Sequence, residues 1–183
     1  MQVTKTDIDG VFLITPQVFE DDRGCFFESY NQKVFNEAIG MPVHFVQDNE
    51  SQSTFGVLRG FAFQKGDHSQ AKLVRVTAGE VLDVVVDMRE SSPTFGKMVM
   101  HKLSSENKAQ VFIPRGCAHA FVAMSDFAIF HYKVDNDYSQ QAQSGFRFDD
   151  PDIAVPWPFE KGQLKVSDKD LSWPSFKDAY KFK

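Results

Sequence analysis

Basic and amide side chains gather between residues 55 and 76, and they are the residues in this sequence most suited to chemistry. Apolar residues alternate with polar ones there and Gly66 interrupts the run, which predicts two short strands joined by a turn. The polar residues singled out in this run are Arg59, Gln64, Gln70, Lys72 and Arg75. Cations that converge on a concave sheet suit a phosphate or diphosphate, because guanidinium forks bind phosphate oxygens in pairs. The alternative is an ordinary solvated strand face, where basic residues are common.

The orientation of these side chains follows from strand geometry. Residues two apart on a strand share a face. The alternation therefore predicts that Arg59 points to the same side as Phe61, and that Gly60 and Ala62 point to the other side.

Three residues further along the chain could transfer a proton or stack on a ring. His119 follows a Pro-Arg-Gly turn and could accept a proton, although a single strand histidine is often structural. Tyr132 could donate a proton if a dry interior keeps it neutral, and the alternative is a hydrogen-bonded core tyrosine. Tyr138 could stack on a base or lie at the surface beside a turn. The full candidate site comprises Arg23, Glu28, Gln47, Asn49, Arg59, Lys72, His119, Tyr132, Tyr138, Lys169 and Asp170.

Metal and cofactor motifs are missing from the sequence. Barrel proteins that bind a metal use a close cluster of His and Glu on neighbouring strands, whereas His68 and His119 lie far apart here. The sequence also lacks a Gly-rich phosphate loop, a zinc Cys/His pattern and a nucleophile elbow. We therefore expect neither a metal nor a cofactor.

Composition limits the class of protein. The 183 residues, 42% hydrophobic and 25% charged, indicate one soluble globular domain that spans residues 1–183. A net charge of -5 argues against a general nucleic-acid binder, so an anion site has to be a local basic pocket. Cys25 and Cys117 lack metal-ligand spacing and suggest a reducing compartment. The sequence has no signal-like apolar segment and no run near the ~18 apolar residues of a membrane span, so we expect a cytoplasmic protein.

Short strands separated by turn signals predict an all-β sandwich or barrel. One early helix is predicted over residues 31–39, with Gly40 as its stop. The valine-rich segment 79–87 predicts a strand with both faces covered.

Two further segments complete the prediction of the fold. Residues 43–46 read as a short strand that ends in a polar cluster at 47–51. A tail rich in proline and tryptophan follows residue 148, and we expect it to wrap the barrel or a neighbouring subunit.

The chain resembles the dTDP-4-dehydrorhamnose 3,5-epimerases over nearly all of its length. The segments that carry the resemblance occur in the family's order, and they are residues 21–24 with Phe26 and Glu28, then 45–51, 56–60, 70–76, 79–89, 92–96, 113–116, 118–119, 132–133 and 167–170. The resemblance implies a double-stranded β-helix, that is, a cupin-like jelly roll, without a metal. It also implies a homodimer with exchanged strands and a dTDP-linked 4-keto-6-deoxy sugar as substrate.

The resemblance assigns expected roles to single residues. In this family of isomerases, one histidine removes the protons beside the sugar's ketone, a tyrosine on the opposite face returns them, and an aspartate orients the histidine. Carried over by motif, Tyr132 is the acid and Asp170 is the orienting carboxylate. Tyr138 would stack on the thymine. The residues expected to hold the nucleotide and sugar are Arg23, Glu28, Gln47, Asn49, Arg59, Lys72, His119 and Lys169.

The chain departs from the family at the base itself. Ala62 stands where the family has its catalytic histidine, and losing a general base typically costs about 10²–10⁴ in rate. Cys117, Ala120 and Gln143 stand where the family has Phe, Gly and a substrate-binding Glu. We expect Ala62, Cys117 and Ala120 to border the pocket.

Three functions follow from these observations. We expect an epimerase-type isomerase of dTDP-rhamnose biosynthesis that is slowed or limited to one carbon, in which His119 or a water held by Asp170 replaces the base. A catalytically inactive dTDP-sugar binder is the first alternative. The second is an epimerase scaffold repurposed or engineered for another substrate in the space left at Ala62.

Overall fold

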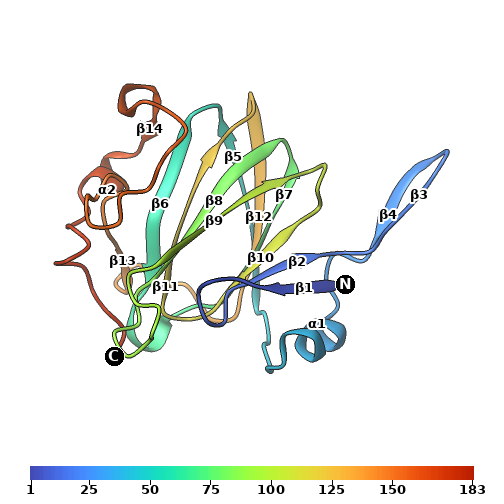
Figure 1. The fold of residues 1–183 in the computed structure, drawn as a ribbon, viewed down its shortest axis with the longest axis horizontal. Helices are drawn as coiled ribbons and strands as arrows, with labels where there is room; N and C mark the ends of the chain where they lie inside the picture. The colour runs from blue at the N-terminus through green and yellow to red at the C-terminus, as the bar shows by residue number, and fades with distance from the viewer.

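Two β-sheets lie face to face in a computed structural model that describes the backbone of residues 1–183 and every side chain except that of Lys161 (Figure 1). The first sheet has the order β1 (Gln2–Lys5), β2 (Phe12–Thr15), β10 (Gln110–Ile113), β7 (Lys72–Ala78), β12 (Phe127–Val134) and β5 (Gln47–Thr54). The second has the order β13 (Gln143–Gly145), β6 (Val57–Gln64), β11 (Cys117–Ala123), β8 (Glu80–Asp87) and β9 (Met98–Ser104), and β14 (Lys165–Val166) pairs with β6. The fold is the expected all-β, cupin-like jelly roll.

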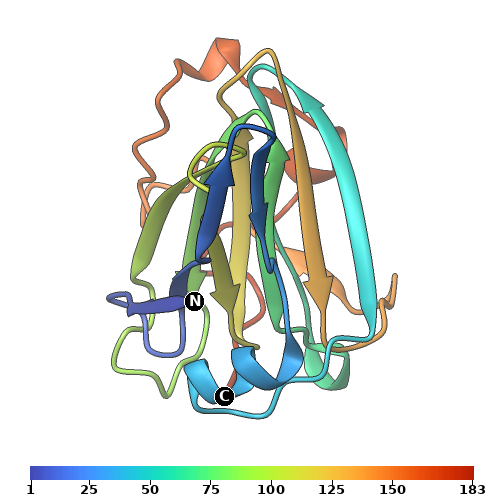
Figure 2. The same cartoon turned by 90° about the vertical axis from the view of Figure 1, so that its right-hand side faces the viewer.

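Strand pairing within both sheets is antiparallel, apart from the parallel pairing of β14 with β6. Figure 2 looks onto the first sheet, where β5 and β12 run side by side at one edge. The remaining strands, β3 (Val18–Asp21) and β4 (Gly24–Phe27), form a separate hairpin that extends away from the sheets (Figure 1).

Apolar side chains fill three layers. The space between the sheets holds branched residues such as Val74 and Val85. Helix α1 (Gln32–Ile39) covers the outer face of the first sheet, where Phe35 packs against Phe112. The tail after β13 covers the outer face of the second sheet. It contains α2 (Asp168–Leu171) and the short helical turn Lys161–Gln163, and another such turn, Gly66–His68, joins β6 to β7.

The covered outer face explains the valine-rich sequence of β8. Val81 and Val85 belong to the layer between the sheets, while Val84 and Val86 belong to the layer beneath the tail. A strand buried on both faces loses the usual alternation of apolar and polar residues. The prediction that both faces of this strand are covered is confirmed.

The early helix also forms as predicted. The Asn31 side chain accepts a hydrogen bond from the Val34 N–H at its start. Gly40 ends it in the left-handed conformation, with a φ of 74° that favours glycine.

The prediction of a strand at residues 43–46 is wrong. These residues pack under α1, where Val43 is buried, and the polar segment that follows them forms β5 instead. Most side chains of β5 stay partly or fully exposed at the edge of the sheet, so the strand has no apolar face for a sequence pattern to detect.

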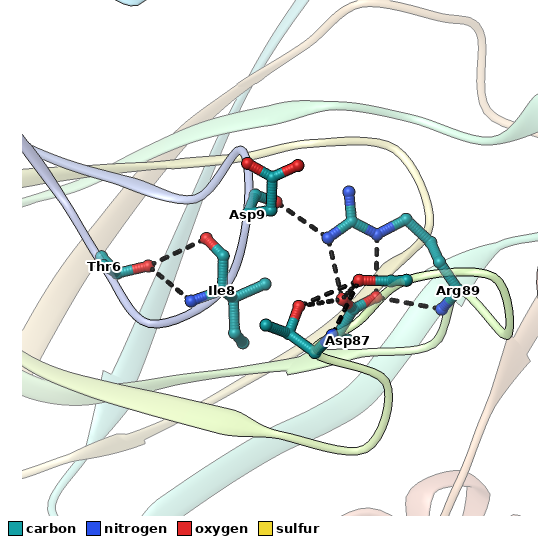
Figure 3. A network of polar contacts seen from close by, with 7 residues as sticks. Thr6, Ile8, Asp9, Asp87 and Arg89 are labelled. Carbon is teal, nitrogen blue, oxygen red and sulfur yellow. Dashed lines mark hydrogen bonds and ion pairs between the residues drawn. The ribbon is translucent and has the colours of Figure 1, made fainter.

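A buried polar network fastens the N-terminal loop to the end of β8 (Figure 3). The Asp87 carboxylate accepts hydrogen bonds from Arg89 Nε and Nη2, both at 2.8 Å, and from the hydroxyls of Ser92 and Thr94. Arg89 Nη2 also donates to the Asp9 carbonyl at 2.8 Å. Burial alone would raise the pKa of Asp87, but these hydrogen bonds outweigh it and hold the pKa below its usual value.

Among the described residues, no helix combines the length and apolar character that crossing a bilayer requires.

Candidate functional site

A cavity of about 180 Å³ lies between the two sheets and receives side chains from both. The second sheet supplies Arg59, Ala62 and His119. The first supplies Lys72 and Tyr132, together with the Ser51 hydroxyl. The phenyl rings of Phe121 and Phe130 also line it, stacked with their centroids 4.1 Å apart. Two cations, one imidazole and one phenol therefore share a single partly apolar space.

The predicted alternation along β6 is wrong at Gly60. Arg59 and Ala62 both line the cavity, whereas Phe61 packs beneath the tail, stacked on Phe146 at 4.4 Å. The register of β6 against β11 shifts at this point, and Gly60 has a φ of +107°. A Cβ at residue 60 would lie 2.4 Å from the His119 carbonyl oxygen, so the irregularity requires glycine.

His119 is held by a carboxylate that the sequence analysis missed. Its Nε2 lies 2.5 Å from Oδ1 of Asp83, whose side chain is fully buried. A carboxylate oxygen accepts hydrogen bonds, so this contact favours the tautomer in which Nε2 carries the proton and Nδ1 keeps a free electron pair. The available signal was a single aspartate inside the buried, valine-rich strand β8.

Ala62 and His119 face each other across neighbouring strands. They are direct partners in the β6–β11 register, so the imidazole stands on the same wall as Ala62, where the resemblance leads us to expect the base. Tyr132 reaches the cavity from the opposing sheet. Burial raises the pKa of the Tyr132 phenol, which outweighs the lowering by the Arg59 charge, and Tyr138 raises it further. Tyr132 therefore remains a proton donor at neutral pH.

The two cavity cations differ in their surroundings. Burial lowers the pKa of Lys72 to about 8, and the Asp83 charge opposes this shift. Arg59 is more exposed, and its guanidinium donates to Ser53 Oγ at 3.0 Å and to the Gln52 carbonyl at 3.2 Å. These bonds use two of its five N–H groups. The guanidinium is thus anchored and can still bind an anion.

Polar residues on β5 and beyond β12 lie near this space. Gln47 and Asn49 share a face of β5 with Ser51, and Asn49 is the register partner of Tyr132. Gln47 Nε2 donates to Asn49 Oδ1 at 2.8 Å. The Tyr138 hydroxyl donates to Gln143 Oε1 at 3.1 Å while its ring stays 54% exposed. A planar ligand could therefore stack on Tyr138.

Within one chain, Arg23 and Glu28 do not reach the cavity. Arg23 lies at the turn of the projecting β3–β4 hairpin, where its side chain is 85% exposed and pairs with Asp21 at 2.5 Å. Glu28 follows the hairpin and accepts a hydrogen bond from Asn31. The hairpin extends away from the body of the same chain, which is the physical reason for the separation.

Asp170 and Lys169 do not line the cavity either. Asp170 Oδ1 accepts a hydrogen bond from the Trp173 indole at 3.1 Å, and Lys169 Nζ lies 5.9 Å from the centre of the Trp173 ring. This indole packs against Gly145, where a Cβ would lie 2.9 Å from it, and Gly145 is the register partner of Ala62. The carboxylate expected to orient a base is thus engaged with a tryptophan near the strand of Ala62.

Cys117 and Ala120 do not border the pocket, so that prediction is wrong. Cys117 packs in the core between the sheets, and burial raises the pKa of its thiol to about 12. Ala120 faces the layer beneath the tail. Both residues lie outside the cavity wall formed by β11, to which His119 and Phe121 contribute. Among the described side chains, no group of three or more His, Cys, Asp or Glu has an arrangement that could hold a metal ion.

Comparisons with known proteins agree on one family. The family model described as dTDP-4-dehydrorhamnose 3,5-epimerase matches residues 5–178. The enzyme of that name from Shigella flexneri is 52% identical over 98% of both chains. A dTDP-4-dehydrorhamnose 3,5-epimerase structure from Elizabethkingia anophelis has a TM-score of 0.94, with 48% identity over 97% of both chains. The epimerase from Legionella pneumophila, solved with dTDP-4-keto-L-rhamnose, has a TM-score of 0.92 and 42% identity over 97% of this chain and 93% of its own.

Proposed function

Because the chain belongs to the dTDP-4-dehydrorhamnose 3,5-epimerases, enzymes of dTDP-rhamnose biosynthesis, we propose that its cavity binds a dTDP-linked 4-keto-6-deoxy sugar and removes protons beside the ketone at a reduced rate. The observation that carries the proposal is the convergence of Arg59, Lys72, His119 and Tyr132 around Ala62.

The size and charge of the cavity support binding of a nucleotide-linked sugar. A cavity of about 180 Å³ suits the sugar, so the nucleotide lies outside it, on the side of the exposed Arg59. The guanidinium binds the diphosphate, which the protein's net charge of -5 would otherwise repel. Gln47 and Asn49 supply amide groups from β5, and Tyr138 stacks on the thymine. The Legionella relative, solved with a ligand of this class, supports the choice of ligand.

Formation of an enolate sets the requirements for catalysis. Removing a proton beside a ketone requires a base and a cation or donor at the developing oxyanion. Lys72 remains largely protonated at pH 7 and supplies the cation. Tyr132 remains protonated and returns a proton from the opposing sheet. Ala62 cannot accept a proton, which accounts for the reduced rate.

The proposal includes a homodimer in the cytoplasm. The projecting hairpin exposes Phe19 and Phe26, at 56% and 71%, and places Arg23 at its turn. In the dimer, this hairpin packs on a second copy of the chain and brings Arg23 and Glu28 towards the partner's cavity. Cys25 and Cys117 are both free thiols, which suits a reducing compartment.

A second function is favoured by Ala62. Without a base, the same cavity binds the dTDP-sugar and releases it unchanged. Deuterium exchange beside the ketone distinguishes the two functions, since only the epimerase exchanges protons with solvent.

Calorimetry with dTDP tests the proposal. The native chain binds dTDP, and Arg59→Gln lowers the affinity by about tenfold or more, because a hydrogen bond to a charged group contributes about 1.5–3 kcal/mol. Arg147→Gln, which removes an exposed arginine paired with Asp149, is the matched control and leaves the affinity unchanged. A native chain without affinity for dTDP would dismiss the proposal.

A further inference from the structure

The imidazole of His119 lies directly beside Ala62, the position at which the base is expected and missing. His119 and Ala62 are register partners on neighbouring strands, and both line the cavity. Directly opposed residues have Cβ atoms about 4.5–5.5 Å apart. A proton acceptor on His119 is therefore displaced from the family's position by about one strand spacing and stays on the same wall, opposite Tyr132.

The environment of Asp83 argues for more than a structural role. The carboxylate is fully buried, Oδ1 contacts His119 at 2.5 Å, and Oδ2 has no hydrogen-bond partner among the described residues. A buried carboxylate with a single hydrogen-bond partner is stabilised by each positive charge beside it. The Lys72 ammonium supplies one such charge, and proton uptake by His119 adds a second in direct contact with Oδ1.

The other candidate to replace the base, a water held by Asp170, is less well placed. Asp170, which could hold a water, accepts a hydrogen bond from Trp173 and is not among the residues that line the cavity. His119 needs no intermediary, because its ring already lies in the wall.

We propose that His119 is the proton acceptor of this chain and that Asp83 is the positioning residue that fixes its tautomer, an inference that rests on the proposed function. The C–H bond beside the ketone breaks, its electron pair forms the enolate, and the proton goes to Nδ1 of His119. The resulting imidazolium faces the Asp83 carboxylate, and the Lys72 ammonium faces the enolate oxygen. Tyr132 then protonates the carbon from the opposite face, and water exchanges the protons of both groups after release.

The displaced base also determines which carbon reacts. C3 and C5 flank the ketone on opposite sides, and a base moved by about one strand spacing cannot approach both equally. The chain therefore exchanges one of the two carbons much faster than the other.

Deuterium incorporation into the keto sugar tests this assignment in four proteins, and the thermal unfolding of each verifies its fold. His119→Gln lowers the rate by about 10² or more, and Asp83→Asn lowers it by about tenfold or more. The matched control is His131→Gln, which removes another histidine paired with an aspartate, Asp48 at 3.4 Å, that does not line the cavity. Its rate stays within about twofold of the native rate.

Chemical rescue separates a proton acceptor from a structural histidine. Imidazole added to His119→Ala restores exchange, and the rescued rate depends on the pKa of the added base. Nitrogen-15 NMR of the native protein shows the Nε2–H tautomer of His119, and Asp83→Asn loses this preference. Rescue by imidazole and the tautomer signal both distinguish a proton acceptor from a structural histidine, even if a variant loses some stability.

Several results would overturn the assignment. A native chain that binds dTDP but exchanges neither carbon has no proton acceptor, and a His119→Gln variant with the native rate uses a different one. A larger loss in Asp170→Asn than in Asp83→Asn would assign the role to the water. Absence of dTDP binding would instead dismiss the proposed function itself.

Discussion

Lys72 is a cavity residue that loses its positive charge at mildly alkaline pH. Burial lowers its pKa from 10.5 to about 8, so the ammonium is present below pH 8 and is lost as the pH rises through that value. The pKa of Tyr132 is raised above its usual value, so the phenol keeps its proton in this range. An alkaline decline near pH 8 therefore belongs to Lys72.

We expect kcat/KM for proton exchange to fall above pH 8 in the native chain, because kcat/KM reports groups of the free enzyme. Lys72→Met is slow and has no decline between about pH 7 and 9, since no charge remains to be lost. Lys72→Arg is the control, because arginine stays charged throughout. A decline that persists unchanged in Lys72→Met would contradict this assignment.

Sequence reasoning anticipated much of the site at this scale, but not its support. Arg59, Lys72, His119 and Tyr132 were chosen by residue type and motif, and the structure gathers them in one cavity. Asp83 was missed because the pattern of one strand does not show which residue of a neighbouring strand a buried polar side chain contacts. Its partner His119 comes from another strand, 36 residues away in the chain.

Strand and helix patterns predicted the elements well where each face of an element was uniformly apolar or uniformly polar. The valine-rich β8 and the capped helix α1 fulfil their predictions because burial on two faces and a glycine stop leave clear patterns. The polar strand β5 was not predicted because its side chains line the cavity or face solvent at the sheet edge, so the strand has no apolar face. The irregularity at Gly60 could not be predicted either, since it depends on the close approach of β11.

At the end of β8, the network around Asp87 gives a prediction about stability. Asp87→Asn leaves Arg89 without its buried anion, and breaking a buried ion pair costs about 3–5 kcal/mol, of which the amide recovers a part. We expect urea denaturation to give an unfolding free energy lower by about 2–4 kcal/mol.

Lys102→Gln is the control for this variant. It breaks the exposed pair with Glu80, and such pairs contribute little. Equal stability of Asp87→Asn and the native chain would contradict the structural role of the network. The pKa of Asp87 is lowered in the folded state, so its contribution is present above the unfolded pKa and is lost as acid protonates the carboxylate.

At the scale of the whole molecule, the two most exposed phenyl rings, Phe26 and Phe19, lie on one hairpin. Helix α1 and the C-terminal tail cover the outer faces of the two sheets. The tail was expected to wrap the barrel or a neighbouring subunit, and it wraps the barrel of its own chain. The β3–β4 hairpin remains uncovered, with Phe26 71% exposed.

We expect Phe26→Ser to weaken the proposed homodimer, because burial of a phenyl ring contributes about 1.5–3 kcal/mol. Sedimentation at a series of concentrations measures the effect, and the dTDP affinity falls with the dimer as Arg23 leaves the partner's cavity. Phe127→Ser removes an exposed phenyl ring on β12 and serves as the control. A native chain that sediments as a monomer at all concentrations would contradict the dimer.

Deuterium incorporation at C3 and C5 of the dTDP-linked keto sugar, compared between the native chain and Ala62→His, is the most direct test of the proposed epimerase site, in which Ala62 stands at the position expected for the base. The native chain exchanges slowly and mainly at one carbon, and Ala62→His exchanges both carbons at a rate higher by about 10² or more. Native exchange as fast as that of Ala62→His, or no exchange by the native chain at either carbon, would contradict the account.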